Sequence, residues 1–325
     1  MNKVLVTGCS GFIGFHLCLD LLKKNIKVFG IDSINSYYST KLKLDRLKIL
    51  KQHKNFKFSK GNIINLKFVE NIFKKNNFKI VFHLASQPGV MYSYINPKAY
   101  TDNNIKATEN LAKLSNKYYV EKFIFTSSSS VYGDKKNFPI QENTLLKPKN
   151  YYAKTKIKCE KILTKIFYKK NKNTLIITRP FTVYGSYGRP DMLFIQAVNK
   201  LKKNQTIPIY NNGEYERDFT YVKDVTKVLV ILSKYKKKNK ITVNICGAKP
   251  IKIINFIKKI INLENFNLLN LIKFYPKRKG EMLKTFGSNT FLKKLTKVRK
   301  FTGYDKGLRE TFSWYKNYKH KKYLY

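Results

Sequence analysis

Tyr152 and Lys156 lie four residues apart, in the segment Tyr-Ala-Lys-Thr-Lys. On a helix, this spacing puts both side chains on one face. A free phenol has a pKa near 10 and is a poor base at neutral pH, and lowering that pKa to about 7 takes roughly 4 kcal/mol. An ammonium about 6 Å away contributes roughly 3 kcal/mol at an effective dielectric constant of 20. The pair can therefore act as a general base if a further positive charge is close. In a chain with 23 tyrosines the spacing also arises by chance, so its position decides its meaning.

A run of serines stands upstream of this pair. Ser127 to Ser130 end a predicted strand, Phe123–Ser127, and lead into Val-Tyr-Gly. In a parallel sheet, ligands bind beyond the carboxyl ends of the strands. A serine in this run can hydrogen-bond a substrate hydroxyl and pass its proton to Tyr152. The alternative reading is an ordinary serine-rich turn.

A glycine triad, Gly8, Gly11 and Gly14, follows the first predicted strand and precedes a predicted helix. Glycines let the backbone turn sharply and approach a pyrophosphate, and the helix N-terminus offers unpaired N–H groups to that anion. Glycines at such junctions can also be purely steric. Asp32 ends the second predicted strand, where a carboxylate accepts hydrogen bonds from ribose hydroxyls and repels a 2′-phosphate. With no arginine directly after Asp32, the pattern favours NAD over NADP.

The elements that must position these residues alternate between strands and helices, which is typical of a parallel sheet with crossover helices. We therefore predict an α/β fold, a Rossmann-type doubly wound parallel sheet with a smaller C-terminal substrate-binding lobe. The NAD-binding domain is expected over residues 1–180, with segments of about 214–247 returning to it, and the lobe mainly over 181–325. The predicted strands are Val4–Thr7, Val28–Asp32, Phe56–Lys60, Ile80–Leu84, Phe123–Ser127 and Leu175–Thr178. The predicted helices include Phe12–Lys24, Tyr151–Lys170, Val222–Tyr235, Ile251–Ile261 and Gly307–Tyr318.

The charge balance is unusual, since 66 Lys+Arg against 19 Asp+Glu give a formal net charge of +47. A concentrated basic face would indicate nucleic-acid binding. Here the lysines occur in nearly every segment, which fits a global bias toward residues with A- and T-rich codons. We therefore disfavour nucleic acid as a main partner and expect the charge to attract anionic substrates.

The four cysteines and four histidines are scattered along the chain. This pattern fits reduced thiols in a cytosolic protein and disfavours a metal site. No apolar stretch approaches the roughly 20 residues that span a bilayer. The chain runs directly into a strand-like segment, which leaves no room for a signal peptide. We expect a cytoplasmic protein with no metal ion and no membrane segment.

The glycine triad, Asp32, the serine run and the Tyr152/Lys156 pair stand in an order that resembles the extended short-chain dehydrogenase/reductase family. The resemblance covers nearly the whole chain and is closest to the UDP-glucuronate 4-epimerase branch of that family. The segments that carry it are Gly11–Leu17, Asp32–Tyr38, Phe181–Gly185, Gly188–Met192 and Arg217–Tyr221.

The resemblance implies a 4-epimerase that keeps NAD bound. Tyr152 would take the sugar 4-hydroxyl proton while hydride leaves C4 for NAD, aided by Ser128 and Lys156, and the 4-keto sugar would then turn and receive the hydride on its other face. The implied cofactor-binding residues are Gly8, Gly11, Phe12, Ile13, Gly14, Asp32, Asn35, Asn62, Ile63, Leu84, Ala85, Asn104, Ser127, Tyr152 and Lys156. The implied UDP-sugar contacts are Gln87, Ser129, Ser130, Thr182 and Arg189, with Arg217 and Arg278 on the diphosphate.

Several alternatives remain open at this stage. Related 4,6-dehydratases carry an acid-base pair, and decarboxylases a glutamate, where this chain has Ser129 and Ser130, so both reactions are disfavoured. Epimerisation of UDP-galactose or UDP-N-acetylglucosamine is the rival within the family. Arg189-Pro190-Asp191 favours the uronate, whereas Met91 stands where an arginine is common. Asn62 and Ser86 also depart from the usual aspartate and alanine. A degenerate family member that binds nucleic acid is disfavoured because every catalytic position holds a competent residue.

The resemblance further implies a homodimer. Relatives often pack two helices from each subunit into a bundle. The corresponding segments here are Asn96–Tyr118 and Tyr151–Lys170.

Overall fold

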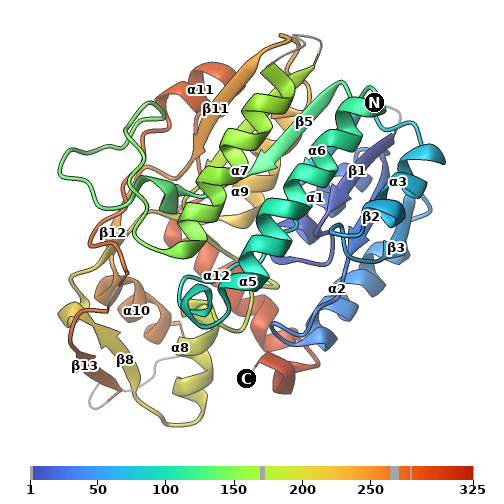
Figure 1. Ribbon diagram of the computed structural model, residues 1–325. Helices are drawn as coiled ribbons and strands as arrows, with labels where there is room; N and C mark the ends of the chain where they lie inside the picture. Colours follow the sequence, from blue (N-terminus) through green and yellow to red (C-terminus); the bar gives the residue numbers. More distant parts are fainter. Residues whose placement is uncertain (1–2, 169–172, 264–270, 279, 325) are drawn as a thin grey trace.

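A seven-stranded parallel sheet forms the centre of the protein (Figure 1). The computed structural model describes residues 3–168, 173–263, 271–278 and 280–324. The strand order is β11-β6-β5-β4-β1-β2-β3, so the chain starts in the middle of the sheet and winds outward in both directions. The predicted fold class is confirmed. The strands are β1 (Lys3–Thr7), β2 (Lys27–Asp32), β3 (Phe56–Lys60), β4 (Ile80–His83), β5 (Lys122–Thr126), β6 (Thr174–Pro180) and β11 (Lys240–Ile245).

Helices cover both faces of this sheet, and each interface has its own apolar core. Strands β4 and β6 are buried along their whole length, as expected for strands covered on both sides. One face carries α3 (Leu66–Lys74), α6 (Ala107–Lys117) and α7 (Tyr151–Tyr168), and the other carries α1 (Phe12–Leu22), α2 (Thr40–Lys51) and α9 (Val222–Leu232). The predicted helix Tyr151–Lys170 matches α7, and its last two residues lie outside the described part of the chain.

The predicted helical segment from Asn96 to Tyr118 is not one regular helix. A short helix α4 (Tyr92–Ile95) precedes α5 (Pro97–Tyr100), which begins after an Asn96 cap, and residues Thr101–Lys106 then form a π-helical turn, η1, before α6 begins. Such turns insert an extra residue into a helix and are frequent at functional sites. This one carries Asn104.

Small paired strands and further helices form the lobe at the carboxyl side of the sheet, in the lower left of Figure 1. The predicted helix Ile251–Ile261 begins only at Ile253, because its first two residues form β12 and pair with β9. Strand β11 and helix α9 lie with the central sheet, whereas the boundary at residue 180 stays a prediction. The further elements after residue 180 are β7 (Thr182–Tyr184), α8 (Leu193–Lys202), β8 (Ile207–Tyr210), β9 (Glu216–Arg217), β10 (Phe219–Tyr221), β12 (Ile251–Lys252), α10 (Ile253–Ile261), β13 (Ile272–Tyr275), α11 (Thr290–Thr296) and α12 (Tyr304–Asn317), with 3₁₀ turns η3 (Asn211–Gly213) and η4 (Lys321–Leu324). Of these, α11 lies beside β11 and α9 rather than in the lobe. A further 3₁₀ turn, η2 (Ser129–Tyr132), lies earlier in the chain, after β5.

One buried cation connects three of the loops that leave this framework. The side chain of Arg46, on α2, is fully buried. Its Nη1 donates to the Ser10 carbonyl at 2.8 Å and to the Tyr38 hydroxyl at 2.6 Å, and its Nη2 donates to the Tyr187 carbonyl at 2.6 Å. The glycine loop, the loop after β2 and the loop after β7 are therefore held by a single guanidinium.

Tyr187 is fixed from its other side as well. Its φ of 55° lies in the left-handed region, which is uncommon for an aromatic residue. Its ring packs 4.9 Å from Phe15 of α1 and 4.9 Å from Trp314 of α12, measured between ring centroids. The loop after β7 is thus anchored to both halves of the molecule.

No helix in the described residues has the length and apolar character needed to cross a membrane.

Replacing Arg46 with methionine should lower the free energy of unfolding by about 2 to 4 kcal/mol, because three oxygens lose their donor in a buried setting. Urea unfolding followed by circular dichroism measures this change. The exposed Arg309 of α12 provides the control, and Arg309→Met should change stability by less than about 0.5 kcal/mol. Equal unfolding midpoints for Arg46→Met and the unchanged protein would contradict the assignment.

Candidate active site

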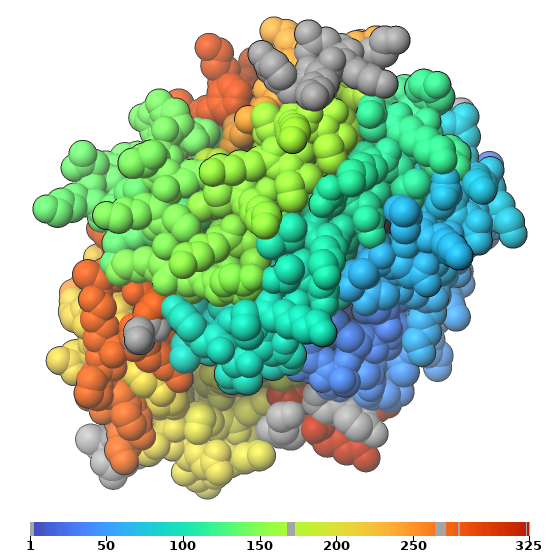
Figure 2. Space-filling view, in the orientation of Figure 1, coloured from blue at the N-terminus to red at the C-terminus, as the bar shows by residue number. Residues whose placement is uncertain are grey.

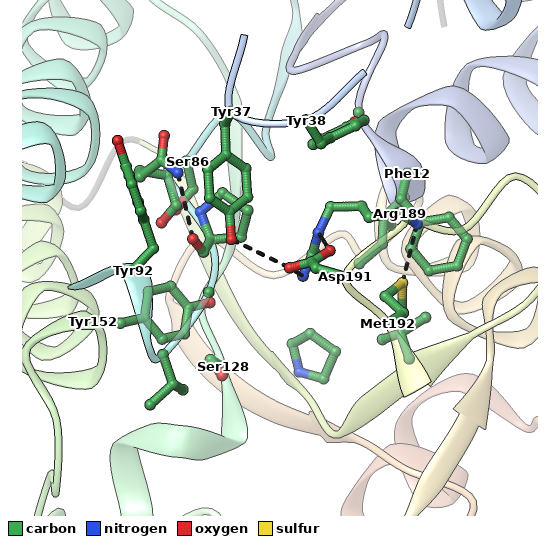
Figure 3. A pocket seen from close by; sticks show the side chains of 18 of the residues that line it. Phe12, Tyr37, Tyr38, Ser86, Tyr92, Ser128, Tyr152, Arg189, Asp191 and Met192 are labelled. Atoms are coloured by element: carbon green, nitrogen blue, oxygen red, sulfur yellow. Dashed lines mark hydrogen bonds and ion pairs between the residues drawn. The ribbon is translucent and has the colours of Figure 1, made fainter. Parts of the chain in front are cut away.

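A cavity of about 950 Å³ opens at the carboxyl ends of the strands, between the sheet and the C-terminal lobe (Figure 3). Every residue proposed from the sequence for the site lines this cavity, except Asn104. The lining residues include Gly8, Gly11, Phe12, Ile13, Gly14, Asp32, Asn35, Asn62, Ile63, Leu84, Ala85, Gln87, Ser127, Ser128, Ser129, Ser130, Tyr152, Lys156, Thr182, Arg189, Arg217 and Arg278. The sequence motifs are therefore gathered around one space.

The glycine loop leaves no room for side chains. Gly8 has a φ of +74°, and a Cβ there would lie 2.8 Å from the Ala85 nitrogen. A Cβ on Gly14 would lie 2.0 Å from the Gly8 carbonyl oxygen. Helix α1 begins after Gly11 with no side-chain cap, so its first N–H groups face the cavity edge without a side-chain acceptor. This is the arrangement that binds a dinucleotide diphosphate.

Asp32 stands at the end of β2, beside the glycine loop. Its Oδ2 accepts from the Ser10 N–H at 3.0 Å, and its Oδ1 accepts from the Ile34 N–H at 2.9 Å. These bonds fix the carboxylate at the cavity wall, and each oxygen keeps a further lone pair. The residues present thus fit an adenosine ribose next to the glycine loop.

Lys43 is a site residue that the sequence reasoning missed. It projects from α2 to the cavity wall, and its Nζ donates to the backbone oxygen and to Oδ1 of Asn35, both at 2.6 Å. Burial lowers the pKa of Lys43 to about 8, while the nearby Asp32 acts in the opposite direction. In a sequence this rich in lysine, no local signal separates Lys43 from its exposed neighbours.

Asn104 lies behind the cavity wall. Its Oδ1 accepts from the Gln87 N–H at 2.7 Å, and its Nδ2 donates to the Thr155 hydroxyl at 3.0 Å. From this position the π-helical turn holds the Gln87 backbone and the start of α7 together. The direct cofactor contact expected for Asn104 stays a prediction.

Tyr152 and Lys156 stand on the first turns of α7, with Ser128 opposite Tyr152 (Figure 3). The Lys156 Nζ donates to the Thr126 carbonyl at 2.9 Å and lies 5.9 Å from the centroid of the Tyr152 ring. Burial raises the pKa of Tyr152, and a hydrogen bond with Ser128 acts against that rise. Burial also lowers the pKa of Lys156 to about 8. A phenol in this setting needs added positive charge to act as a base near neutral pH, as the sequence reasoning requires.

The four serines have different surroundings. The Ser127 hydroxyl donates to Glu160 Oε1 at 2.6 Å, in a buried pair that Glu160 forms with Arg179. Ser127 therefore lines the cavity while its hydroxyl proton is already engaged. The Ser128 Oγ accepts from the Ser130 N–H at 3.1 Å, which leaves its own proton available to a ligand or to Tyr152. Of Ser127 and Ser128, it is Ser128 that is suited to hydrogen-bond a reacting hydroxyl.

Three arginines line the lobe side of the cavity. The Arg189 guanidinium forms a two-point ion pair with Asp191. Arg278 stacks on the Tyr210 ring at 3.8 Å, and Arg217 lies over the Tyr215 ring at 5.1 Å. Both of these guanidinium groups also lie 3.6 Å from carboxylate oxygens of Glu281, so a phosphate would bind beside Glu281 or replace it as their partner. This end of the cavity can therefore bind an anionic ligand.

The cavity offers few side chains that can take part in acid-base or metal chemistry. Among the cavity residues proposed to react, Tyr152 is the candidate acid-base group, and the neighbouring Ser129 and Ser130 can bind a ligand but are too weakly acidic to act as general acids or bases at neutral pH. In the described residues, no three His, Cys, Asp or Glu side chains gather as metal ligands. The geometry suits proton transfer at a hydroxyl next to a bound dinucleotide.

Comparison with known proteins is consistent with this geometry. A UDP-glucuronate 4-epimerase from Thermodesulfobacterium geofontis is 32% identical over 97% of this chain and 97% of its own. The crystal structure of a UDP-glucuronic acid 4-epimerase from Bacillus cereus, in complex with UDP-glucuronic acid and NAD, has a TM-score of 0.90 at 29% identity and covers 99% of this chain and 100% of its own. A UDP-glucose 4-epimerase from Thermotoga maritima, solved with UDP-glucose, has a TM-score of 0.88 at 26% identity over 97% of this chain and 99% of its own.

The model of the NAD-dependent epimerase/dehydratase family matches residues 4–246, which span the glycine loop, the serine run and the Tyr152/Lys156 pair. This protein belongs to the NAD-dependent epimerase/dehydratase family, with the extended short-chain dehydrogenase/reductase fold.

Proposed function

We propose that this protein is an NAD-dependent UDP-sugar 4-epimerase that interconverts UDP-glucuronate and UDP-galacturonate. The observation that carries the proposal is the pairing of Tyr152 with Ser128 and Lys156 at one end of a cavity whose other end holds Arg217 and Arg278. The similarity to UDP-glucuronate 4-epimerases over nearly the whole chain supports it.

NAD would be held by the glycine loop, Asp32 and Lys43, and it supplies the hydride acceptor at sugar C4. Tyr152 accepts the proton of the 4-hydroxyl, and Ser128 orients that hydroxyl. Lys156 holds positive charge next to the phenol. When the sugar has turned, hydride would return to the opposite face of C4 and Tyr152 would give the proton back to the oxygen on that carbon, so that the residues end each cycle as they began.

Arg217 and Arg278 would bind the diphosphate and leave the sugar able to rotate beyond it. The cavity of about 950 Å³ is large enough for a UDP-sugar beside the cofactor. Arg189, with Thr182 and the serines Ser129 and Ser130, would contact the sugar and its carboxylate. A dehydratase or decarboxylase would need a carboxyl group where these two serines stand.

A neutral sugar is the second candidate substrate. Met91 lines the cavity without a charge. A cation at this position would attract a uronate, so its absence lowers the advantage of a uronate over a neutral sugar. The conversion assay therefore also includes UDP-galactose and UDP-N-acetylglucosamine.

Incubation of the purified protein with UDP-glucuronate, without added NAD, should give UDP-galacturonate on anion-exchange chromatography. Turnover without added cofactor is expected because the same NAD is regenerated in each cycle. Conversion of UDP-galactose or UDP-N-acetylglucosamine, but not of UDP-glucuronate, would change the assigned substrate and leave the proposed mechanism unchanged. Absence of conversion with all three sugars, by protein that carries bound NAD, would refute the proposed activity.

Tyr152→Phe should reduce turnover by about 10²- to 10⁴-fold, the range for loss of a general acid-base group, while bound NAD is retained. The ratio of absorbance at 260 and 280 nm reports retention. Tyr151→Phe is the matched control, since the Tyr151 hydroxyl contacts Thr101 at 2.7 Å and does not line the cavity. Near-normal turnover in Tyr152→Phe would remove Tyr152 from the mechanism.

The proposal includes a homodimer formed through α6 and α7, which lie side by side on the face of the molecule that Figure 2 shows. The exposed face of α7 carries a stripe of lysines, Lys154, Lys158, Lys161 and Lys165, for which no ion pair is found among the described residues. On α6, the acidic Glu109 is already paired with Lys113. Two copies related by a two-fold axis would bring lysines close together across this face.

We expect the dimer to be more stable at high salt, because salt screens the repulsion between the lysines of the two copies. The Debye length falls from about 10 Å at 0.1 M to about 3 Å at 1 M. Sedimentation at micromolar protein, in low and in high salt, measures the dimer fraction. Lys161→Glu should raise this fraction at low salt, and Lys238→Glu, on an exposed loop before β11, should not. A monomer under both conditions would rule out the dimer.

The proposed cellular location is the cytoplasm. All four cysteines are buried and carry free thiols. This arrangement suits a reducing compartment.

A further inference from the structure

Three side chains that line the cavity form a chain of contacts. Tyr37 comes from the loop between β2 and α2, and Asp191 and Arg189 come from the loop between β7 and α8. The Tyr37 hydroxyl donates to Asp191 Oδ2 at 3.2 Å. Arg189 donates to Asp191 through Nε at 2.9 Å and through Nη2 at 3.0 Å. Figure 3 shows the three in a row, with Tyr152 and Ser128 on another side of the same cavity.

The pairing with Asp191 uses one edge of the Arg189 fork. A guanidinium has five N–H donors, and Asp191 takes one from Nε and one from Nη2. The end formed by Nη1 and Nη2 keeps three donors, so a second anion can still bind there with two parallel bonds. Asp191 therefore fixes the plane of the guanidinium and leaves its outer end to a ligand.

Tyr37 is itself held in place. A Cβ on Gly89 would lie 2.2 Å from the Tyr37 hydroxyl, so glycine at that position makes room for the contact. The Tyr37 ring packs 5.0 Å from Tyr92, measured between centroids. Burial raises the pKa of Tyr37 to about 12, with Asp191 contributing, so the hydroxyl stays a donor at neutral pH.

We propose that Tyr37 and Asp191 are positioning residues, which orient Arg189 for the carboxylate of an anionic sugar and so set the preference for a uronate over a neutral sugar. This inference rests on the proposed epimerase function. Neither residue touches the reacting hydroxyl, and both act through Arg189. Tyr37 lies in the loop that also carries Asn35, so the loop at the adenosine side of the cavity contributes to selection at the sugar side.

Binding to the NAD-loaded protein tests this directly, by calorimetry with UDP-glucuronate, UDP-glucose and UDP. Tyr37→Phe should weaken UDP-glucuronate about five- to tenfold, as expected for partial loss of a hydrogen bond to a charged group. Asp191→Asn should weaken it at least as much. UDP and UDP-glucose should bind within about twofold of their normal affinity, since they present no carboxylate to Arg189. In turnover assays the same variants should raise KM for UDP-glucuronate and leave kcat within about twofold.

Two further variants separate positioning from general damage. Tyr37→Phe combined with Asp191→Asn should be no weaker than Asp191→Asn alone, because Tyr37 acts through Asp191. Tyr94→Phe is the control, as the Tyr94 hydroxyl contacts the Lys149 carbonyl at 3.4 Å and does not line the cavity. It should bind all three ligands normally. Bound NAD is checked in each variant by absorbance.

Failure of the positioning role can be distinguished from failure of the proposed epimerase activity. If the unchanged protein neither converts UDP-glucuronate nor binds it more tightly than UDP, the proposed function fails first. In the other case, the unchanged protein converts UDP-glucuronate and binds it more tightly than UDP. If the variants Tyr37→Phe and Asp191→Asn then also bind UDP-glucuronate normally, only the positioning role is wrong. Tighter binding of UDP-glucuronate to Asp191→Asn would also overturn the inference, since Asp191 would then compete with the substrate for Arg189.

Discussion

The architecture of the cavity depends on a guanidinium that has no carboxylate partner among the described residues. Arg46 gives its hydrogen bonds to two backbone carbonyls and one hydroxyl, from three loops that are far apart in sequence. Removing a charged group from water is costly, and it is tolerated where several oxygens replace the lost hydration. The glycine loop and the loop carrying Arg189 consequently share one anchor, so the cofactor side and the substrate side of the cavity are not independent.

Much of this organisation follows from local sequence. The glycine loop, Asp32 and the serine run each follow a strand, and in a parallel sheet the ends of successive strands meet at one edge. That rule places Ser128 near Gly8, and the cavity includes both together with Tyr152 of α7. The strands were located well because buried parallel strands are nearly continuous apolar runs.

The remaining features depend on tertiary contacts that local patterns do not encode. Ile251 and Lys252 have helical neighbours but pair with β9, and the extra residue in η1 has no signature in composition. Lys43 is one lysine among many until α2 packs against the sheet. Asn104 and Ser127 are predicted cofactor contacts, and local sequence does not indicate that the fold also engages their polar atoms with Thr155 and Glu160. The hydrogen-bond partner of a buried polar side chain is determined by the tertiary structure around it.

The chain has a single tryptophan, Trp314, and its ring packs against Tyr187 with 4.9 Å between centroids. Tyr187 lies two residues before Arg189, in the loop that faces the sugar end of the cavity. Indole emission responds to the polarity and motion of its surroundings. The fold thus contains an intrinsic fluorophore next to its substrate loop, through which ordering of that loop is observable in real time without a label.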